Sequence, residues 1–374
     1  MKIATACCVG LLIASSFAAA QQLALPSNPL CGGRSVTAFA DWPQFQFDPC
    51  HTGYNPNEFI LGSSNVAKLV LAWQYPGGFW PSVLANGILY VGSYDHALYA
   101  FNATTGTLVW KYQISLRGYA TPVVANGVVH FGSEKDRYAV SATDGTLLWK
   151  YTAGSAVYDP ATVVDGVVYF GAGDGVYALN AATGAFVWKF AGFRMSPPAV
   201  VNGVVYSAGG YDGSVYALNA NTGAQLWMSE GYSSNVPVVA NGIVYLGSSD
   251  YNTGVVALRA ATGTFLWQFK TVSEVFNSPA VAYGIVYLAS SDSHLYALNA
   301  QTGELLWAYY HDPFSGPSPM VANGVVYAVS YDGLQAVDAF AGQLLWMNEE
   351  VYASPVVTNG WLYIGGDASH LPGS

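Results

Sequence analysis

The chain has 374 residues, of which 12 are Lys or Arg and 22 are Asp or Glu, so its formal net charge is −10. Nucleic acids and anionic membranes are bound by clustered Lys and Arg side chains, and this balance argues against both as partners. Only 9% of the residues are charged while 52% are hydrophobic, so much of the chain must be buried.

Residues 1–20 have the pattern of a signal peptide. Lys2 is their only charge, an apolar run follows at residues 9–13, and Ala18-Ala19-Ala20 supplies the small residues of a cleavage site. We therefore expect export to the periplasm or the extracellular space. Ala4, three residues before Cys7, stands where a bacterial lipoprotein signal has Leu or Val, which argues against a lipid anchor. No later apolar run reaches the ~20 residues of a membrane-spanning helix.

Two cysteines, Cys31 and Cys50, follow the leader, and both precede the repeats. A lone pair in an exported chain predicts a disulfide bond. Two free thiols are the alternative. We assign residues 21–62 to an N-terminal lead-in that contains this bond, and residues 63–374 to the repeats.

A tryptophan recurs along the chain with a nearly constant spacing. The copies, most of which read Gly-x-x-x-Trp, end at Trp73, Trp110, Trp149, Trp188, Trp227, Trp267, Trp307 and Trp346, and successive copies are 37, 39, 39, 39, 40, 40 and 39 residues apart. A period near 40 residues indicates one small supersecondary unit per repeat.

Each unit is predicted to contain four short strands. Runs of about six residues rich in Val, Leu and Tyr are separated by turn residues, as in "PAVAYG", "IVYLAS", "LYALNA" and "ELLWAYY" from Pro279 onward. Asn-Gly or Asp-Gly closes the first hairpin of most units, which predicts two-residue type I′ turns. Units that are apolar on both faces stack as the blades of a β-propeller. Eight tryptophans therefore predict an all-β, eight-bladed propeller of four-stranded antiparallel blades, with residues 66–75 joining the C-terminal strands to close the ring.

The stretches "ALNAATGAFVW" (178–188), "ALNANTGAQLW" (217–227) and "ALNAQTGELLW" (297–307) resemble the tryptophan-docking repeat of the pyrroloquinoline-quinone (PQQ) propellers. That group includes quinoprotein alcohol dehydrogenases and the propeller lipoprotein of the outer-membrane barrel-assembly machinery. The resemblance implies that each Trp packs against an Ala and a Gly-bearing turn of a neighbouring blade. It also implies that the lead-in, "DWPQFQFDPCHTGYNP" (41–56), lies against the propeller.

Candidate binding residues are those that vary between repeats on a constant frame. They lie just ahead of the first strand of each unit and are predicted to surround the channel mouth: Trp80, Tyr119, Tyr158, Asp159, Arg194, Asn235, Asn277 and Tyr352. The alternatives stay open. The aromatic residues can simply pack at the mouth, Asp159 and Arg194 can form a loop salt bridge, and the two Asn residues can cap turns. The histidines are scattered without metal-ligand spacing, so we expect no metal site.

The resemblance also raises PQQ chemistry, which in the dehydrogenases uses calcium, an Asp base and adjacent cysteines. Here the adjacent pair, Cys7-Cys8, lies in the leader, and Arg194 is the only cation placed at the inner end of a mouth loop, facing a cofactor with three carboxylates. We therefore expect no cofactor, and a monomeric, non-catalytic scaffold that binds a protein or peptide at its mouth. The alternative is a PQQ- and calcium-dependent oxidoreductase with Asp159 as its base.

Overall fold

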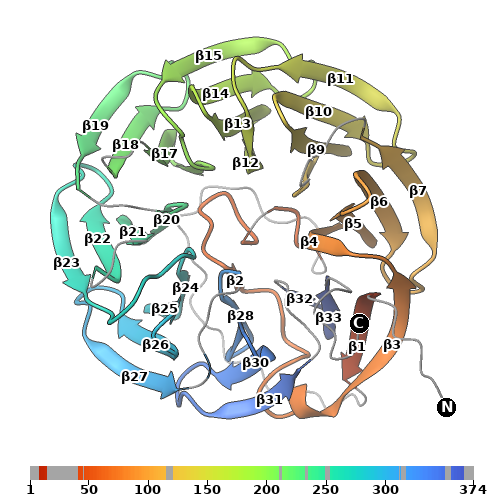
Figure 1. Cartoon of the computed structure of the whole chain (residues 1–374), viewed down its shortest axis with the longest axis vertical. Helices are drawn as coiled ribbons and strands as arrows, with labels where there is room; N and C mark the ends of the chain where they lie inside the picture. The colour runs from red at the N-terminus through yellow and green to blue at the C-terminus, as the bar shows by residue number, and fades with distance from the viewer. Residues whose placement is uncertain are drawn as a thin grey trace.

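The structure, a computed structural model, describes residues 8–14, 41–44, 46–114, 121–209, 213–231, 235–248, 253–310, 312, 317–349 and 355–365. Within these residues the regular structure is β-sheet, apart from the short 3-10 helix η1 (Val66–Lys68). Eight sheets surround a central axis (Figure 1). In seven of them four antiparallel strands lie in chain order from the axis outward.

Seven of these sheets are blades built from four consecutive strands. Blade one is β4 (Phe79–Ala85), β5 (Ile88–Ser93), β6 (Ala97–Asn102) and β7 (Leu108–Gln113); blade two is β8 (Val123–Ala125), β9 (Val128–Ser133), β10 (Asp136–Ser141) and β11 (Leu147–Thr152). Blade three is β12 (Val157–Val164), β13 (Val167–Ala172), β14 (Gly175–Asn180) and β15 (Phe186–Ala191); blade four is β16 (Ala199–Val201), β17 (Val204–Gly209), β18 (Ser214–Asn219) and β19 (Gln225–Ser229). Blade five is β20 (Val238–Ala240), β21 (Ile243–Gly247), β22 (Val255–Arg259) and β23 (Phe265–Phe269); blade six is β24 (Ala280–Ala282), β25 (Ile285–Ser290), β26 (His294–Asn299) and β27 (Leu305–Tyr310). Blade seven is β28 (Met320–Ala322), β29 (Val325–Ser330), β30 (Gly333–Asp338) and β31 (Leu344–Asn348), and β2 (Tyr54–Asn55) adds a parallel fifth strand at its inner edge.

The eighth sheet is assembled from both ends of the chain. Its order is β3-β1-β33-β32, where β1 is Cys8–Ala14, β3 is Leu69–Pro76, β32 is Val356–Thr358 and β33 is Trp361–Ile364. The predicted eight-bladed propeller is therefore wrong as stated: the repeats build seven blades, and a composite sheet closes the ring. Residues 66–75 do contribute its outer strand, but the strand between β3 and β33 comes from the segment expected to be a signal peptide.

The hairpins between the first and second strands follow the turn chemistry of the sequence. Asn86 and Gly87 have φ values of 50° and 74°. In the Asn-Gly, Asp-Gly and Tyr-Gly pairs of the other sheets, both residues likewise have a positive φ. Type I′ turns require this at both central residues. The predicted hairpin type is thus confirmed.

The tryptophans of the repeat join neighbouring blades. The indole Nε1 of Trp188 donates a hydrogen bond to the Ala220 carbonyl of the next blade at 2.8 Å, and Trp73, Trp110, Trp149, Trp227, Trp267 and Trp307 make the equivalent bond. A Cβ atom on Gly223 would lie 2.6 Å from the Trp188 ring, so the close approach needs glycine. Trp346 packs against the core of the composite sheet.

Candidate functional site

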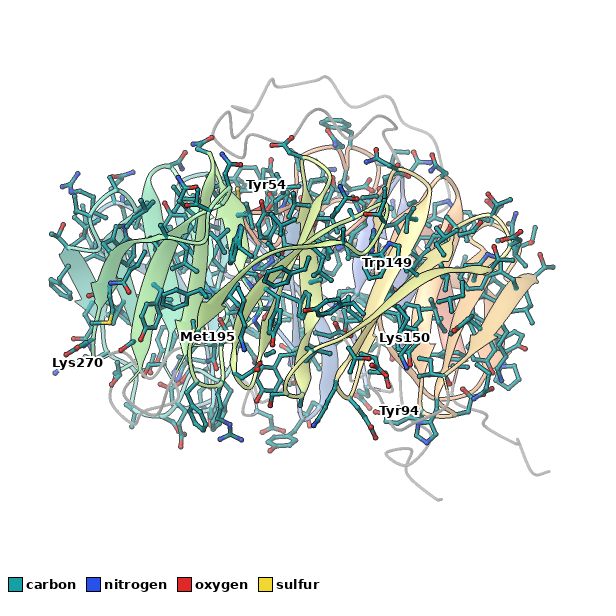
Figure 2. The ribbon with its side chains drawn as sticks, turned by 90° about the horizontal axis from the view of Figure 1, so that it is seen from above. Tyr54, Tyr94, Trp149, Lys150, Met195 and Lys270 are labelled. Atoms are coloured by element: carbon teal, nitrogen blue, oxygen red, sulfur yellow. The ribbon has the colours of Figure 1, made fainter. Side chains whose placement is uncertain are left out.

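The two ends of the propeller are chemically different. One end, here called the loop face, carries the loops from each outer strand to the next inner strand and the turns between second and third strands. The other end, the hairpin face, carries the type I′ hairpins. Tyr94, in the turn between β5 and β6, and Tyr54, in the lead-in, lie toward opposite faces (Figure 2). Because strands alternate in direction, the predicted binding residues belong to the loop face.

The structure describes most of these residues. Tyr158 and Asp159 lie near the start of β12, Arg194 in the loop before β16, Asn235 in the loop before β20 and Asn277 in the loop before β24. Trp80 belongs to β4, but its side chain lies outside the described part of the chain, as do Tyr119 and Tyr352 entirely.

Asp159 is engaged inside the propeller. Its Oδ1 lies 2.5 Å from Nη1 of Arg137 on β10 of blade two, and its Oδ2 accepts a hydrogen bond from the Gly132 N–H at 2.8 Å. The Arg137 side chain is fully buried and that of Asp159 is 8% exposed. Arg194 was the expected partner, but it is exposed and its N–H donates to the Gly173 carbonyl. The suggested loop salt bridge between Asp159 and Arg194 is therefore replaced by an ion pair between blades two and three.

Two further departures from the repeat surround this pair. Arg137 occupies a position that is Leu98 in blade one and Val176 in blade three, and its guanidinium lies 4.7 Å from the centre of the Phe170 ring. His130 replaces the Tyr that other blades use, as Tyr90 does, to bond a carbonyl of the next blade. Burial, aided by the Arg137 charge, lowers the His130 pKa to about 3, so the imidazole is neutral at physiological pH.

The amide residues of the loop face serve the loops themselves. Asn235 donates from Nδ2 to the Val275 carbonyl at 2.8 Å and from its backbone N–H to the Gly247 carbonyl. It therefore joins the loop before blade five to the one before blade six. This bond between two loops differs from the turn cap that was the alternative for Asn235.

Large apolar side chains are exposed on the loop face. They are Tyr94, Phe193, Val272, Phe276, Tyr310 and Tyr331, with exposed fractions between 41% and 76%. Other exposed apolar residues, such as Leu108 and Leu147, stand on the outer strands and recur evenly around the rim, so they belong to the repeat. The loop-face residues do not follow the repeat, and exposed apolar groups of that kind mark interaction sites.

The lead-in forms a collar inside the ring, which sequence reasoning placed only "against the propeller". The collar is residues 41–44 and 46–55. Backbone N–H groups of the inner strands donate to it: Leu84 to Trp42, Val124 to Pro43, Val200 to Pro49, Val239 to Cys50, Val281 to Thr52 and Val321 to Gly53, all at 2.7–2.9 Å. The Val163 N–H donates to Oε1 of Gln44, and Asn55 Nδ2 donates to the Val357 carbonyl. The collar thus bonds the inner strand of every sheet.

The collar also contains buried polar residues. His51 is 1% exposed, and its Nε2 lies 2.9 Å from Thr162 Oγ1. Burial lowers the His51 pKa to about 4, so this ring is neutral. Glu58, just beyond the collar, is also buried and accepts hydrogen bonds from the N–H groups of Ile60, Leu61 and Gly360. Cys50 is buried too, while Cys31 lies outside the described residues, so the disulfide bond stays a prediction.

The residues of the channel and the loop face do not match the donors that PQQ with calcium would need. In the described part of the chain, no three His, Cys, Asp or Glu side chains are grouped so that they could hold a metal ion. The carboxylate proposed as a base, Asp159, is held by Arg137. The hydrogen-bonding edges of the inner strands are already used by the collar. We therefore derive no step through a quinone.

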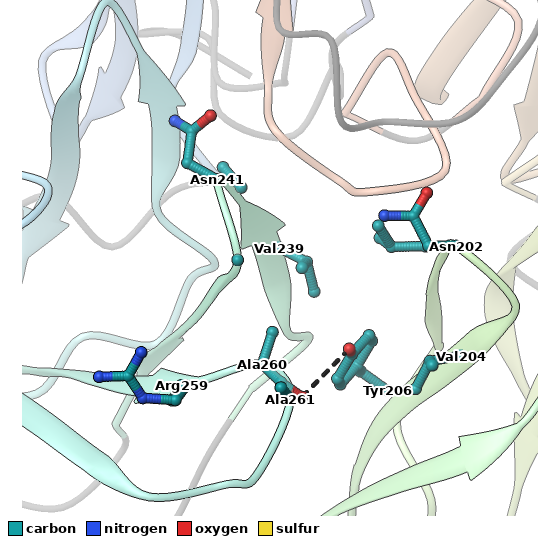
Figure 3. A pocket seen from close by; sticks show the side chains of 11 residues that line it. Asn202, Val204, Tyr206, Val239, Asn241, Arg259, Ala260 and Ala261 are labelled. Atoms are coloured by element: carbon teal, nitrogen blue, oxygen red, sulfur yellow. Dashed lines mark hydrogen bonds between the residues drawn. The ribbon is translucent and has the colours of Figure 1, made fainter.

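A cleft on the hairpin face was not predicted. It has a volume of about 510 Å³ and lies between blades four and five, lined by the hairpins at Asn202 and Asn241 and by Tyr206, Val239 and Arg259 (Figure 3). Arg259 replaces an Asn or Asp that in most other blades caps its own turn, as Asn219 does by accepting two backbone N–H groups. The break in the repeat at Arg259 was the available sequence signal.

Repeats with docked tryptophans in a closed ring define the class of PQQ-like repeat β-propellers. A family model described as "Outer membrane protein assembly factor BamB" matches residues 66–189, 138–231 and 211–317, and the chain belongs to that family. The resemblance expected from the repeat is thereby confirmed.

Solved structures show the same fold. BamB from Moraxella catarrhalis is 23% identical, with a TM-score of 0.61, and the match covers 71% of this chain and 87% of that one. The quinohemoprotein alcohol dehydrogenase of Comamonas testosteroni is 16% identical, with a TM-score of 0.70 over 86% of this chain and 75% of that one. A europium-containing methanol dehydrogenase is 15% identical, with a TM-score of 0.71, and the match covers 85% of this chain and 87% of that one. At these identities the likeness concerns the fold. No curated protein matches the chain.

Among the described residues, no helix is long and apolar enough to cross a membrane.

Proposed function

We propose that this protein is an exported, non-catalytic scaffold that holds a partner protein on its loop face. The observation that carries the proposal is the set of exposed apolar side chains on that face, at positions outside the repeat. A buried apolar anchor is the usual source of affinity in protein interfaces, and Tyr and Phe are frequent anchors.

The ion pair and hydrogen bond of Asp159 support the non-catalytic part of the proposal. A general base must reach the proton it removes. Asp159 is instead paired with a buried Arg and bonded to a backbone N–H. Export rests on the signal-like pattern of residues 1–20, although the structure places residues 8–14 of that segment in the composite sheet as β1, and the family name agrees with a role in the bacterial envelope.

Incubation with PQQ and calcium, followed by gel filtration, tests the enzymatic alternative. We expect no retained quinone and no dye reduction with alcohols or sugars. Stoichiometric retention together with dye reduction would overturn the scaffold proposal, and Asp159→Asn would then be the first variant to test for lost turnover.

Cross-linking in an extract of the source envelope tests the binding proposal directly. We expect partner recovery to fall in Tyr158→Ala and Phe276→Ala on the loop face. Phe340→Ala is the matched control, because Phe340 is 56% exposed in the turn between β30 and β31 at the hairpin face. A partner that is lost only in the control variant would move the function to the hairpin face.

A further inference from the structure

The residue that follows each docking Trp differs between blades one to three and blades four to seven, and we divide the loop face into two halves on that basis. In blades one to three this residue is Lys111, Lys150 or Lys189. Each lysine pairs with a carboxylate of its own blade, namely Asp95, Asp136 or Asp174, at 2.7–2.8 Å. Each also lies over a Tyr ring of the same blade. The charges of this half are therefore balanced in pairs.

Blades four to seven have no lysine at this position. The corresponding residues are Met228, Gln268, Ala308 and Met347. Carboxylates nevertheless continue around the loop face of this half, at Glu230, Glu274, Asp312, Asp332 and Glu349. Asp292 lies there too, but its side chain is 6% exposed and contacts His294. Among its described residues the loop face here carries Lys270, and Arg194 lies at the border with blade three, in the loop before β16. We call this part, on blades four to seven, the acidic half.

The most exposed apolar residues of the loop face lie in the acidic half. Val272 is 76% exposed, Tyr310 is 72%, Tyr331 is 63% and Phe276 is 50%. In the rest of the loop face, Phe193, in the loop between blades three and four, is 52% exposed and Tyr94 is 41% exposed. Apolar exposure and negative charge therefore coincide on one side of the face.

Val272 and Tyr310 are held in place by the same turn. The Val272 N–H donates to Oδ2 of Asp292 at 3.0 Å, and the ring of His294 lies 5.3 Å from that of Tyr310. Asp292 also accepts a hydrogen bond from the Tyr296 hydroxyl. These contacts fix the backbone at Val272 and the ring of Tyr310 at the end of β27, and fixed contact groups lose less entropy on binding.

We propose that the acidic half binds a basic, apolar segment of a partner protein, in which Lys or Arg alternates with large aliphatic or aromatic side chains. The inference deepens the proposed function and rests on it. The apolar side chains cover Val272, Phe276, Tyr310 and Tyr331, while the cations face the surrounding carboxylates. Opposite charge steers association and excludes acidic segments, and the apolar contacts supply affinity.

A fluorescein-labelled peptide in which Lys alternates with Leu tests this by fluorescence anisotropy on the full chain. Two control peptides keep the spacing: one replaces Lys by Glu, the other replaces Leu by Ser. We expect saturable binding of the Lys-Leu peptide alone, weakened by rising ionic strength. Equal binding of the Lys-Ser peptide would reduce the interaction to general charge attraction and overturn the proposal.

Variants locate the site. The double change Val272→Ser, Tyr310→Ser should weaken binding by about tenfold or more. Tyr94→Ser, an exposed aromatic of the balanced half, should leave it unchanged. For charge, Glu230→Gln with Glu349→Gln should weaken binding, while Glu304→Gln in the turn between β26 and β27 of the hairpin face should not.

The outcomes separate this inference from the proposed function. A peptide that does not bind, or that binds equally well to the Val272 and Tyr310 variant, overturns the basic-segment inference. The scaffold proposal would survive that result if a cross-linked partner still depended on Tyr158 and Phe276. Quinone retention with dye reduction would remove the scaffold proposal whatever the peptide does.

Discussion

Arg137 and Asp159 form an ion pair of 2.5 Å across the interface between blades two and three, beside an apolar core cluster that the same two blades share. Removing one partner of a buried pair leaves an uncompensated charge, which typically costs about 3 to 5 kcal/mol. We therefore expect Arg137→Leu to lower the free energy of unfolding by that amount in urea denaturation. Leu is the residue of the same position in blade one.

The double variant Arg137→Leu, Asp159→Asn tests whether the loss of stability comes from the uncompensated charge. It should recover a large part of the lost stability, since Asn can still accept the Gly132 N–H and carries no charge. A double variant as unstable as the single one would show that packing, rather than charge, dominates at this interface.

The docking tryptophans should dominate the stability of individual blades. Trp188→Ala removes a buried ring and its hydrogen bond to Ala220, and we expect a loss of about 3 to 5 kcal/mol. Trp188→Phe keeps most of the ring but loses the hydrogen bond, worth about 1 kcal/mol net, so it should be clearly milder. Chemical denaturation followed by far-UV circular dichroism measures both, and equal losses would argue against docking by the ring.

His51 predicts a loss of stability in acid. Its folded pKa of about 4 lies below its ordinary value of 6.5, so the unfolded chain binds the proton more readily than the native one. This contribution to stability is complete above about pH 6.5 and is lost as the pH falls toward 4. In His51→Asn, whose Asn tolerates the φ of 59°, the melting temperature should fall less steeply over that window.

His96→Asn is the matched control for this pH series, since His96 is half-buried and has a similar φ of 61°. The acid loss should persist in that variant. If His51→Asn kept the wild-type pH profile, other groups would have to carry the acid sensitivity.

Asn55 connects the collar to the composite sheet. Its side chain is fully buried, donates to the Val357 carbonyl and accepts from the Asn57 N–H. Asn55→Leu leaves both backbone groups without their partner and should cost about 1 to 3 kcal/mol. Asn221→Leu, at an exposed turn, should change the unfolding free energy by no more than about 0.5 kcal/mol.

The expected bond between Cys31 and Cys50 can be measured directly. A disulfide that closes this short loop should stabilise the chain by about 3 kcal/mol in the loop-entropy model. Intact mass after alkylation, with and without prior reduction, counts the free thiols. Two alkylated cysteines in the unreduced protein without its leader would contradict the bond.

The sequence was sufficient for the features that repeat. Turn residues such as Asn86 and Gly87, and the spacing of Trp110 to Trp346, predicted the hairpins and the four-stranded blades because these depend on local chemistry and on nearest neighbours. The number of blades was wrong, since the strand of Trp73 belongs to the composite sheet. The composite sheet was harder, since an apolar run such as residues 8–14 suits a signal peptide as well as a buried strand. The lead-in was expected to lie against the propeller, but its path inside the ring was not predicted, because most of its bonds to the inner strands use backbone carbonyls, which carry no side-chain signature.

The site was only partly predictable for a related reason. Asp159 was singled out correctly as unusual, but its partner lies in another blade, where no spacing rule could connect them. The signal lay in comparing the repeats: Arg137 stands where the other blades have Leu or Val, and His130 stands where they have Tyr. Two such breaks on neighbouring strands of one blade mark the buried pair more clearly than the loop residues do.

The collar has a consequence for the order of folding. Repeat proteins whose units contact only their neighbours can fold and unfold unit by unit. Here one segment bonds every inner strand, and the bond from Asn55 to Val357 spans 302 residues of chain, as does the bond from Gly360 to Glu58 just beyond the collar. During synthesis the collar emerges before any blade, yet its last partners emerge at the other end of the chain. The collar is therefore synthesised first but completes its hydrogen bonds last. Until then, a partly synthesised chain must keep the edges of its inner strands away from other proteins.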